Sequence, residues 1–552
     1  MSRQQHFDYV IVGGGSAGCV LANRLSADPD VSVCLLEAGP SDRWNPFIRI
    51  PVGVIAMMWG RAYNWAFRTE PQKNLNDREL FWPRGKTLGG SSAVNAMCYT
   101  RGDPSDYDHW ADLGNRGWGY RDLLPYFRMS ENFEAGENEY HGAGGGYNVA
   151  QLRETNPLSG VFLKAAEECG FPANNDFSGA TDEGFGYYHV AQKDGRRCSN
   201  AHAFLHPVAR RPNLTVLTRT RGLKVLVEGK RAVGVTVKRK GRLRPNEIRA
   251  DREVILAGGA INSPQLLLLS GIGPREEIEP HGIDLVHELP GVGRNLQDHL
   301  DITLIHRERT RLGISLHPRW LLTRGIPALF RYFLGGRGGA LSSNVAEAGG
   351  FVKLRDEDPV CSLQCHFLPA IEQDHGHNLW NTFRYYGYSL RICDLRPRSR
   401  GHIGLRSAAP SDDPLIQPNY LDQKPDMDHL VAAVRLGRRL LDSNAFAPHR
   451  RDEFKPGTSV QSDDDIREFI RAEAETIYHP VGTCRMGPDP AEAVVDDRLR
   501  VHGMRGLRVV DASIMPTLVG SNTNAPTTAI AEKAAEMIRE DGTDDVSNRD
   551  AG

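Results

Sequence analysis

Three glycines near the start of the chain are spaced as in a loop that binds a dinucleotide. Gly13, Gly15 and Gly18 fill the positions of a GxGxxG pattern, and Glu37 follows about twenty residues later. In such a loop the first glycine permits a tight turn, and the second lets the backbone approach a pyrophosphate. The third allows a helix to pack closely on a strand. The later carboxylate can accept hydrogen bonds from ribose hydroxyls, so the pattern predicts a dinucleotide cofactor.

The residues around this loop predict the strand–helix–strand unit that such a site requires. Residues 8–12 and 31–36 are short apolar runs rich in β-branched residues, and residues 19–25 have a helical period. A GxSxG pattern, which marks the nucleophile elbow of α/β-hydrolases, overlaps the loop at residues 14–18. That elbow follows several strands of a sheet, and here only one predicted strand precedes it. Dinucleotide binding therefore explains the pattern better than a hydrolytic serine.

Later apolar runs extend this unit. Residues 215–260 predict a β-meander, Ser263 and Pro264 predict the start of a helix, and residues 506–511 predict a strand that ends in Asp511. We expect a helix over residues 527–540 and a polar, mostly acidic, disordered tail at 541–552. Strands that alternate with helices indicate an α/β fold.

The composition excludes several classes of protein. The 552 residues carry 67 Lys and Arg against 69 Asp and Glu, and this balance argues against a nucleic-acid-binding protein. Nine scattered cysteines without a CxxC pair favour reduced thiols in the cytoplasm. The sequence predicts neither a signal peptide nor a transmembrane helix. Asp298, His299 and His366 are the remaining candidate metal ligands, and we predict that the protein binds no metal.

Six separate blocks of sequence resemble the glucose–methanol–choline oxidoreductase family. The resemblance extends over essentially the whole chain and is strongest to bacterial choline-dehydrogenase-like alcohol dehydrogenases of the alkanol dehydrogenase type. The blocks, in chain order, are residues 8–40, 85–95 (GKTLGGSSAVN), 259–273 (GAINSPQLLLLSGIG), 291–299 (GVGRNLQDH), 478–487 (YHPVGTCRMG) and 510–527.

The resemblance implies FAD as the cofactor and a chain that leaves its cofactor domain and returns to it. We expect a Rossmann-like FAD-binding domain from residues 1–155, 196–305 and 471–540. A substrate domain of antiparallel sheet and helices is expected from residues 156–195 and 306–470. The residues implied to contact FAD are Gly13, Gly15, Ser16, Ala17, Gly18, Glu37, Ala38, Gly85, Gly89, Ser92, Asn95, Ala96, Val225, Tyr478, Asp511, Ala512, Asn522 and Thr523.

The same resemblance implies that His479 and Asn522 are catalytic. A neutral imidazole with a pKa near 6.5 can accept a hydroxyl proton while a hydride leaves the same carbon for the flavin. The amide at 522 can hydrogen-bond the substrate oxygen. The His-Pro dipeptide alone is uninformative, because it recurs at residues 206–207 and 317–318. Asn524 is an alternative to Asn522.

The expected reaction is the oxidation of a primary alcohol to an aldehyde, with a quinone-like electron acceptor. Some family members bind FAD covalently through a histidine, but the matching position here is Val94, so we expect non-covalent FAD. An oxygen-using alcohol oxidase, a choline dehydrogenase and a lyase of the same fold are alternatives. A non-enzymatic dinucleotide-binding protein would leave His479 and Asn522 without a role. The sequence does not identify the alcohol.

Residues 319–337 combine apolar and basic side chains as a segment on a membrane surface does. Four arginines could meet anionic headgroups. A lid over the substrate pocket and a dimer contact are alternatives, and Gly325 and Pro327 would interrupt a helix here. We therefore expect a cytoplasmic protein that contacts the inner face of the membrane. The side chains predicted to enter the acyl region are Trp320, Leu321, Leu322, Leu329, Phe330, Tyr332, Phe333 and Leu334.

Overall fold

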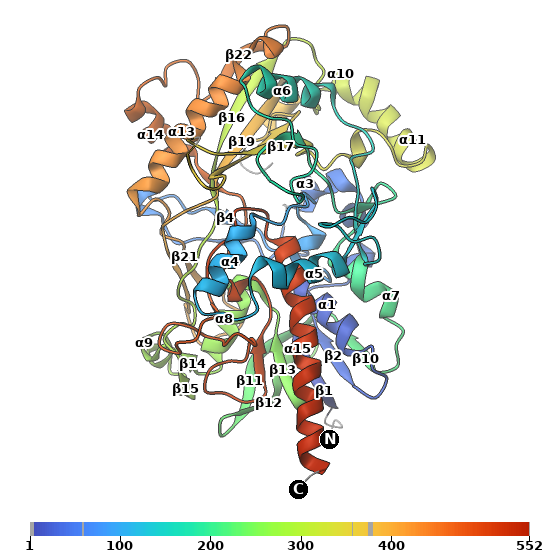
Figure 1. The fold of residues 1–552 in the computed structure, drawn as a ribbon, viewed down its shortest axis with the longest axis vertical. Helices are drawn as coiled ribbons and strands as arrows, with labels where there is room; N and C mark the ends of the chain where they lie inside the picture. Colours follow the sequence, from blue (N-terminus) through green and yellow to red (C-terminus); the bar gives the residue numbers. More distant parts are fainter. Residues whose placement is uncertain (1–4, 58–59, 356, 374–378, 551–552) are drawn as a thin grey trace.

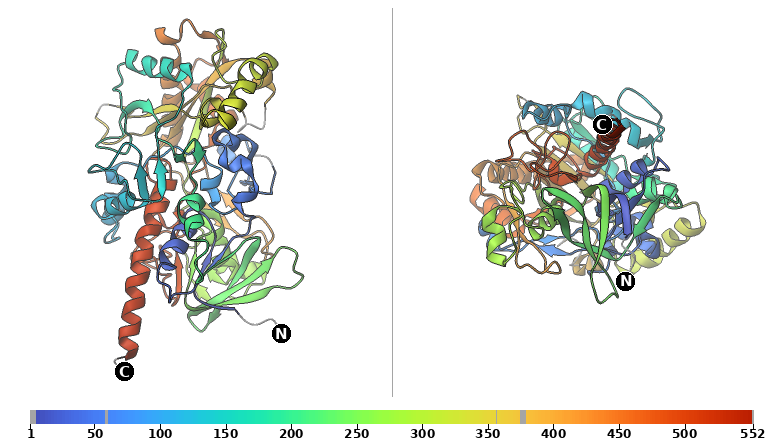
Figure 2. Two further views of the ribbon diagram at one scale, coloured as in Figure 1. Left: turned by 90° about the vertical axis from the view of Figure 1, so that its right-hand side faces the viewer. Right: turned by 90° about the horizontal axis from the view of Figure 1, so that it is seen from below.

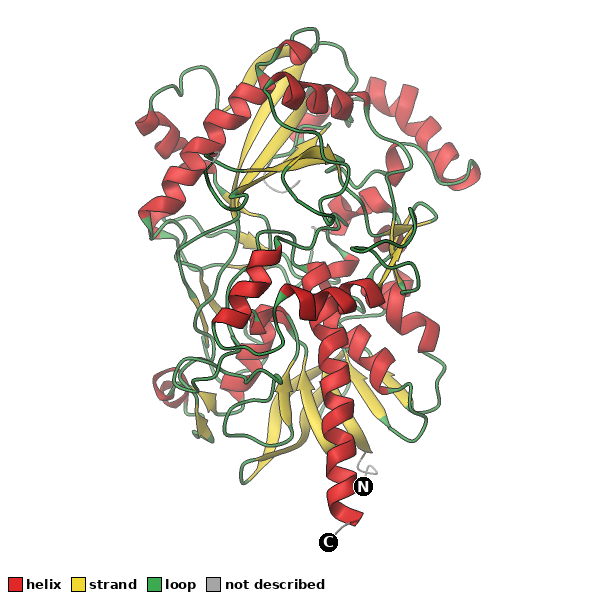
Figure 3. Cartoon of the chain, in the orientation of Figure 1, coloured by secondary structure: helices red, strands yellow, loops and turns green. Residues whose placement is uncertain are grey.

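Two large β-sheets lie at opposite ends of the molecule (Figure 1). The computed structural model describes residues 5–57, 60–355, 357–373 and 379–550. Figure 3 shows the two sheets as two separate groups of strands, in yellow. Strands of the first sheet come from residues 5–36, 214–256 and 507–509, and those of the second come from residues 300–476. Together they confirm the predicted α/β class, with a parallel strand–helix–strand unit and a separate antiparallel sheet.

The first sheet has a parallel half and an antiparallel half. β1, β2, β10 and β24 run parallel alongside β13, whereas β11 and β12 extend it antiparallel. The register places Val10 between Cys34 and Val254, all fully buried, as a doubly covered strand requires. The predicted β-meander is confirmed for β11–β13. It is wrong for β10, which pairs with β2 instead. The strands are β1 (Gln5–Val12), β2 (Val33–Leu36), β10 (Leu214–Leu217), β11 (Thr220–Glu228), β12 (Arg231–Arg239), β13 (Asn246–Leu256) and β24 (Leu507–Val509).

The second sheet is antiparallel and is packed against helices. Phe162 of α6 (Pro157–Glu168) stacks on Phe367 of β18, with ring centroids 4.7 Å apart. Gly437 brings α13 (Lys424–Leu441) onto Leu304 and Ile392 of two central strands. The boundary that we predicted at 305/306 falls within β16. The strands are β17 (Ala348–Val352), β18 (Leu363–Leu368), β19 (Gly387–Asp394), β16 (Leu300–Glu308) and β22 (Arg450–Lys455), with β23 (Glu475–Thr476) also on β16.

The helix after β13 starts earlier than its sequence predicts. α8 spans Gly259–Leu269, so Pro264 lies inside it and Ser263 is not its cap. A proline inside a helix leaves the carbonyl four residues earlier without its usual donor. Here the Thr483 hydroxyl donates to that carbonyl, on Ala260, at 2.6 Å. The proline is therefore accommodated in the helix by a hydrogen bond from a residue more than two hundred positions away. The local sequence does not reveal this partner.

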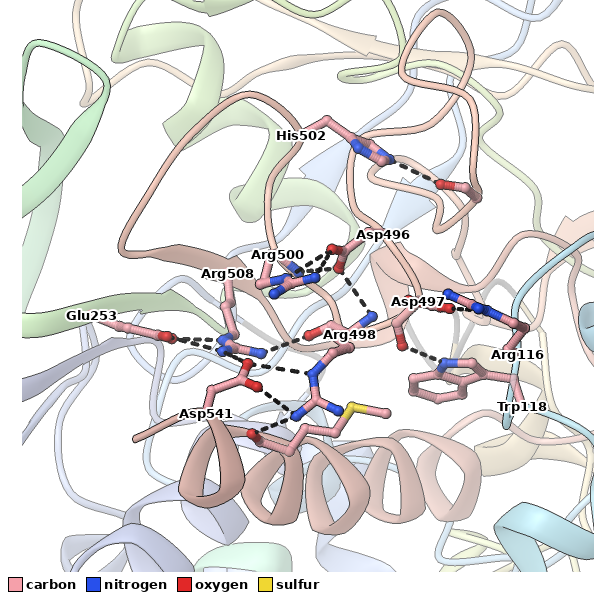
Figure 4. Close-up of polar contacts among 12 residues, drawn as sticks. Arg116, Trp118, Glu253, Asp496, Asp497, Arg498, Arg500, His502, Arg508 and Asp541 are labelled. Carbon is pink, nitrogen blue, oxygen red and sulfur yellow. Dashed lines mark hydrogen bonds and ion pairs between the residues drawn. The ribbon is translucent and has the colours of Figure 1, made fainter. Parts of the chain in front are cut away.

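The C-terminal helix is longer than predicted. α15 (Asn524–Asp550) runs along the first sheet and continues past residue 540, so the tail that we predicted as disordered is helical to residue 550 (Figure 2). Residues 551–552 lie outside the described residues. Arg508, only 2% exposed, donates to Glu253 at 2.7 Å and to Asp541 at 2.5 Å, and Arg498 also donates to Asp541 (Figure 4). These contacts hold the helix as far as Asp541, the first residue of the segment that the acidic sequence alone predicted as disordered.

We expect Asp541→Ala to lower the free energy of unfolding by about 1–3 kcal/mol, because a buried guanidinium loses one of its carboxylate partners. The measurement is chemical denaturation followed by circular dichroism. Glu540→Ala is the matched control, since Glu540 pairs with Arg498 at a more exposed position and should cost at most about 1 kcal/mol. Equal effects of the two substitutions would show that the pair with Arg508 does not stabilise the helix.

Candidate active site

A cavity of about 760 Å³ is lined by residues from both large sheets. It brings together the glycine loop after β1, the loop around residue 95 and the two C-terminal blocks. Segments that are hundreds of residues apart in the chain therefore form one site. The predicted site residues that line it are Gly13, Gly15, Ser16, Ala17, Glu37, Ala38, Gly85, Asn95, Ala96, Tyr478, His479, Asp511, Ala512, Asn522 and Thr523.

The glycine loop is shaped by two close approaches of the backbone. Gly13 has a φ of +117°, which favours glycine, and a Cβ there would lie 2.4 Å from the Ala257 carbonyl oxygen. A Cβ on Gly18 would lie 1.9 Å from the Gly13 oxygen. The loop can therefore turn tightly into α1 (Ser16–Leu25), whose first N–H groups have no helical partner. These groups and the helix dipole suit a phosphate.

Glu37 lies at the end of β2 beside this loop. Its two carboxylate oxygens accept hydrogen bonds from the backbone N–H groups of Gly14, at 3.0 Å, and Gly39, at 2.7 Å. Burial raises the pKa of Glu37 to about 7, although the two N–H groups act in the opposite direction. Each oxygen keeps a further lone pair, so the side chain can also accept from the hydroxyls of a bound ribose.

Four predicted cofactor residues lie outside the cavity lining. Gly18 packs on the loop behind it, and Gly89 is replaced in the lining by its neighbour Gly90. The Ser92 hydroxyl donates to the Gly89 carbonyl and accepts from the Asn200 N–H, so it supports the loop from behind. Val225 is in the hydrophobic core, because β11 approaches the cavity only at its first three residues.

Those first residues of β11 are among the lining residues that the sequence did not reveal. Thr220, Arg221 and Gly222 line the cavity, as does Asn262 of α8. Asn262 belongs to the block at residues 259–273, which did carry a signal. The start of β11 carried none, since its position depends on the pairing of β11 with β12 rather than on a local motif.

His479 and Asn522 meet at the cavity wall. The Asn522 Nδ2 lies 3.2 Å from His479 Nε2, and both residues line the cavity. Behind them, Asp298 accepts a hydrogen bond from the His479 backbone N–H at 2.7 Å and further bonds from the hydroxyls of Tyr420 and Thr476. The 291–299 block therefore fixes the backbone that carries the histidine.

A second histidine sets the tautomer of His479. The Nδ1 atoms of His299 and His479 are 3.0 Å apart, and His299 Nε2 lies 3.3 Å from the Leu395 carbonyl oxygen. A carbonyl only accepts, so His299 carries its proton on Nε2, and its Nδ1 accepts from His479. Burial lowers the pKa of His299 to about 3 and also lowers the pKa of His479 well below its usual 6.5. His479 is therefore neutral, with the lone pair of Nε2 turned to Asn522.

Asn524, the alternative to Asn522, also lines the cavity but has other hydrogen-bond partners. Its Oδ1 accepts from the Ser16 hydroxyl at 2.7 Å, and its Nδ2 donates to the Tyr147 hydroxyl at 2.6 Å. It therefore ties the start of α15 to the start of α1, whereas Asn522 is the asparagine beside His479. His299 and His366 also lie in this region, and no group of three or more His, Cys, Asp or Glu within the described ranges could hold a metal ion.

The part of the cavity formed by residues 314–382 is mainly apolar. Arg391 lines it and forms a two-pronged ion pair with Asp301, at 2.5 and 3.0 Å. Glu372, which also lines it, lies 3.3 Å from the same guanidinium. Two carboxylates therefore share one guanidinium, and the three side chains together carry one net negative charge. The apolar side chains in this lining include Ile314, Leu316, Trp320, Leu321, Ile326, Leu329, Leu341, Leu368 and Ile371.

Comparison with known proteins identifies the family. Family models described as GMC oxidoreductase match residues 7–301 and 397–531. An "Alcohol dehydrogenase [acceptor]" from Pseudomonas putida is 52% identical, over 96% of this chain and 95% of that protein. The mitochondrial choline dehydrogenase of Homo sapiens is 44% identical, over 97% and 90%. The crystal structure of pyridoxine 4-oxidase from Mesorbium loti is 34% identical with a TM-score of 0.87, over 97% and 99%.

These matches confirm the resemblance read from the six blocks, and they confirm FAD as the cofactor, since GMC oxidoreductases are FAD-dependent. The chain belongs to the GMC oxidoreductase family and is an FAD-dependent enzyme.

Proposed function

We propose that this enzyme oxidises an uncharged primary alcohol to an aldehyde, with His479 and Asn522 as the catalytic residues. The observation that carries the proposal is the neutral His479 Nε2, which faces the cavity 3.2 Å from an amide donor. An alcohol oxygen in the cavity that contacts both atoms replaces this hydrogen bond: its hydroxyl can give a proton to Nε2, and the oxygen can accept a hydrogen bond from Asn522 Nδ2. That hydrogen bond strengthens as the oxygen becomes an alkoxide.

The residues at the glycine loop fit FAD. The buried Glu37 keeps free lone pairs for a ribose, and the start of α1 offers N–H groups to a pyrophosphate. When bound, FAD supplies the acceptor for the hydride that leaves the carbinol carbon. We propose that it binds non-covalently, because Val94 lines the cavity at the position where some relatives carry a histidine, and its side chain cannot form that bond.

The lining of the cavity favours a neutral, apolar alcohol over choline. A quaternary ammonium group is stabilised by aromatic faces and by carboxylates with charge to spare. Here Asp301 and Glu372 are both paired with Arg391, so neither carboxylate is unpaired, and only one net negative charge remains. The nearby side chains from residues 314–382 are mostly aliphatic. An aliphatic or aromatic primary alcohol therefore suits the pocket better than a cation.

We propose a quinone-like electron acceptor, with oxygen as the second candidate. The relative at 52% identity is named an alcohol dehydrogenase that uses an acceptor. The 34% identical structure is named an oxidase, and this supports the second candidate.

A panel of alcohols tests the function. Anaerobic enzyme is mixed with hexan-1-ol, benzyl alcohol, hydroxymethylfurfural or choline, and the flavin absorbance and the aldehyde formed are measured. We expect bleaching by the first two and one aldehyde per FAD. Bleaching by choline alone would overturn the substrate class, and FAD-loaded enzyme that none of the alcohols bleaches would overturn alcohol oxidation. Hydrogen peroxide released on admitting air would favour oxygen as the acceptor.

The pH dependence of kcat/KM should reflect the lowered pKa of His479. Burial disfavours the imidazolium, so protonation that removes the base occurs below the usual pKa of 6.5. We therefore expect kcat/KM for hexan-1-ol to stay level as the pH falls through 6.5 and to decline only at lower pH. FAD content measured at each pH separates this decline from acid unfolding. Half-maximal activity at or above pH 6.5 would contradict the assignment.

We also propose that residues 318–334 contact a membrane surface. They stay helical through Gly325 and Pro327, as α10 (Pro318–Trp320), a π-turn (Leu321–Gly325) and α11 (Ile326–Leu334). In the π-turn the Ile326 N–H bonds to the Leu321 carbonyl, so the helix continues into α11 with Pro327 in its first turn. No helix in the described part of the chain is long and apolar enough to span a bilayer.

This segment has an inner and an outer face. Trp320 and Tyr332, which we predicted to enter the membrane, are buried instead, and Trp320 and Leu321 line the cavity. The outer face repeats at helical spacing and includes Leu322 (68% exposed), Phe330 (61%) and Phe333 (63%). The segment thus serves as a wall of the cavity and also presents an apolar surface. The exposed large apolar residues of this surface are Leu322, Ile326, Leu329, Phe330, Phe333 and Leu334.

We expect the triple substitution Leu322→Ser, Phe330→Ser, Phe333→Ser to abolish sedimentation with anionic liposomes at low salt. None of the three residues lines the cavity, so oxidation of hexan-1-ol with a soluble acceptor should persist. Leu243→Ser is the matched control, because Leu243 is 96% exposed on the turn between β12 and β13. If wild-type protein does not sediment with liposomes, or the control and the triple variant behave alike, the surface has another role.

A further inference from the structure

The Asn522 amide is held from two sides at the cavity. Its Oδ1 accepts hydrogen bonds from the Thr100 hydroxyl, at 2.9 Å, and from Gln364 Nε2, at 3.2 Å. Its Nδ2 lies on the other side, 3.2 Å from His479 Nε2. Thr100 and Gln364 are 1% and 0% exposed. Neither was identified from the sequence.

The orientation of this amide decides whether it can assist the reaction. A half-turn about the side-chain bond would exchange the oxygen and the nitrogen with little change of shape. Oδ1 would then face the lone pair of His479 Nε2, and Nδ2 would face two other donors. Only the observed orientation presents an N–H to the substrate oxygen, so a group that prevents the half-turn controls the catalytic donor.

The two donors cannot easily reverse their own roles. The Thr100 hydroxyl oxygen accepts from the Asn522 backbone N–H, at 3.4 Å, and from the Ser521 hydroxyl, so its single hydrogen is left for Asn522 Oδ1. Gln364 Nε2 also donates to the Tyr188 hydroxyl at 3.2 Å. That hydroxyl in turn donates to the Cys365 carbonyl at 2.8 Å. A backbone N–H at one end and a backbone carbonyl at the other therefore fix the direction of the network.

We infer that Thr100 and Gln364 are positioning residues for the reaction, which lock the Asn522 amide with Nδ2 toward His479 and the substrate oxygen. The inference rests on the proposed function. Thr100 follows the 85–95 block, and Gln364 lies on β18 of the second sheet. Elements from both halves of the molecule therefore orient one catalytic amide.

The test removes both donors with little change in volume. In Thr100→Val combined with Gln364→Met, Asn522 Oδ1 loses both of its donors and the half-turned amide becomes accessible. We expect anaerobic bleaching by hexan-1-ol to slow by up to about 10²-fold, the effect of losing one oxyanion donor. FAD content should be unchanged. The apparent pKa of the base should rise, because a turned amide offers Oδ1 to a protonated Nε2. A purely structural role would not move that pKa.

The Asn522→Ala background supplies the control. There the same two substitutions should cause no further loss of rate, because the amide that they orient is absent. Thr100→Ser, which keeps the hydroxyl, should recover most of the rate lost in Thr100→Val alone. If the double variant does not fold, the test compares the bleaching rates of Thr100→Val and Thr100→Ser.

Wild-type rates and an unchanged pH profile in the double variant would overturn the inference, as would an equal loss in the Asn522→Ala background. Either result leaves the proposed function standing if wild-type enzyme is bleached by alcohol. Failure of the wild type to bleach with any alcohol would instead overturn the proposed function.

Discussion

Replacing His479 with alanine should slow the anaerobic bleaching of the flavin by hexan-1-ol by about 10²–10⁴-fold, the usual effect of removing a general base. The methyl group cannot take the hydroxyl proton, and the hydrogen bond between His479 Nε2 and Asn522 Nδ2 is lost. The cavity wall around the glycine loop is unchanged, so FAD content should remain normal. The measurement is rapid mixing at saturating alcohol, so that the rate reflects the chemical step.

The control for this substitution is His109→Ala, since His109 is exposed on α4 (Pro104–Asp112), outside the cavity lining. Its rate should equal that of the wild type. A His479→Ala enzyme that bleaches at the wild-type rate with full FAD would show that another group takes the proton.

Replacing Glu37 with alanine should yield protein that is largely free of FAD. The substitution removes the acceptor for the ribose, and it also leaves the N–H groups of Gly14 and Gly39 without a partner in a buried loop. Each unpaired buried group costs about 1–3 kcal/mol, and the loop that cradles the pyrophosphate loses its shape. FAD per chain, measured by absorbance after purification, reports the effect.

Glu37→Gln separates the two contributions. The glutamine keeps one oxygen for a backbone N–H, so we expect FAD content between that of the wild type and that of Glu37→Ala. Full FAD content in Glu37→Ala would contradict the assignment of this carboxylate to the cofactor. Denaturing the wild type should release free FAD, whereas FAD that remains attached to the chain would contradict non-covalent binding.

The parts of the site that the sequence predicted are those encoded by local motifs. Gly13, Gly15 and Glu37 act within one strand–helix–strand unit, whose apolar runs and spacing are visible in about forty consecutive residues. His479 and Asn522 were placed only by the resemblance of their blocks. The local sequence could not distinguish Asn522 from Asn524, because the difference lies in what each side chain meets across the fold.

The parts that the sequence missed depend on contacts between distant segments. His299, Thr100 and Gln364 act through hydrogen bonds to the two catalytic residues, and their partners are between 158 and 422 residues away. The early start of α8 depends on Thr483, and the continuation of α15 past residue 540 is supported by ion pairs of Asp541 with Arg498 and Arg508. No periodicity or spacing in the chain encodes such pairs.

For residues 319–337, the sequence also could not show which apolar side chains are buried and which are exposed. Their composition predicted an apolar surface, and the helix does present one. Composition could not assign the two faces, because this depends on how α11 is rotated against the cavity wall. Trp320 and Tyr332 are therefore buried, whereas Phe330 and Phe333 are exposed.

The most direct test of alcohol oxidation in this cavity is anaerobic rapid mixing of the FAD-loaded enzyme with hexan-1-ol and with its 1,1-dideuterated form. Hydride transfer from the carbinol carbon breaks the C–H bond, so we expect both alcohols to bleach the flavin fully, the deuterated one more slowly. One hexanal should form per FAD reduced. A flavin spectrum that neither alcohol changes, although the enzyme is folded and holds its FAD, would contradict the proposed function.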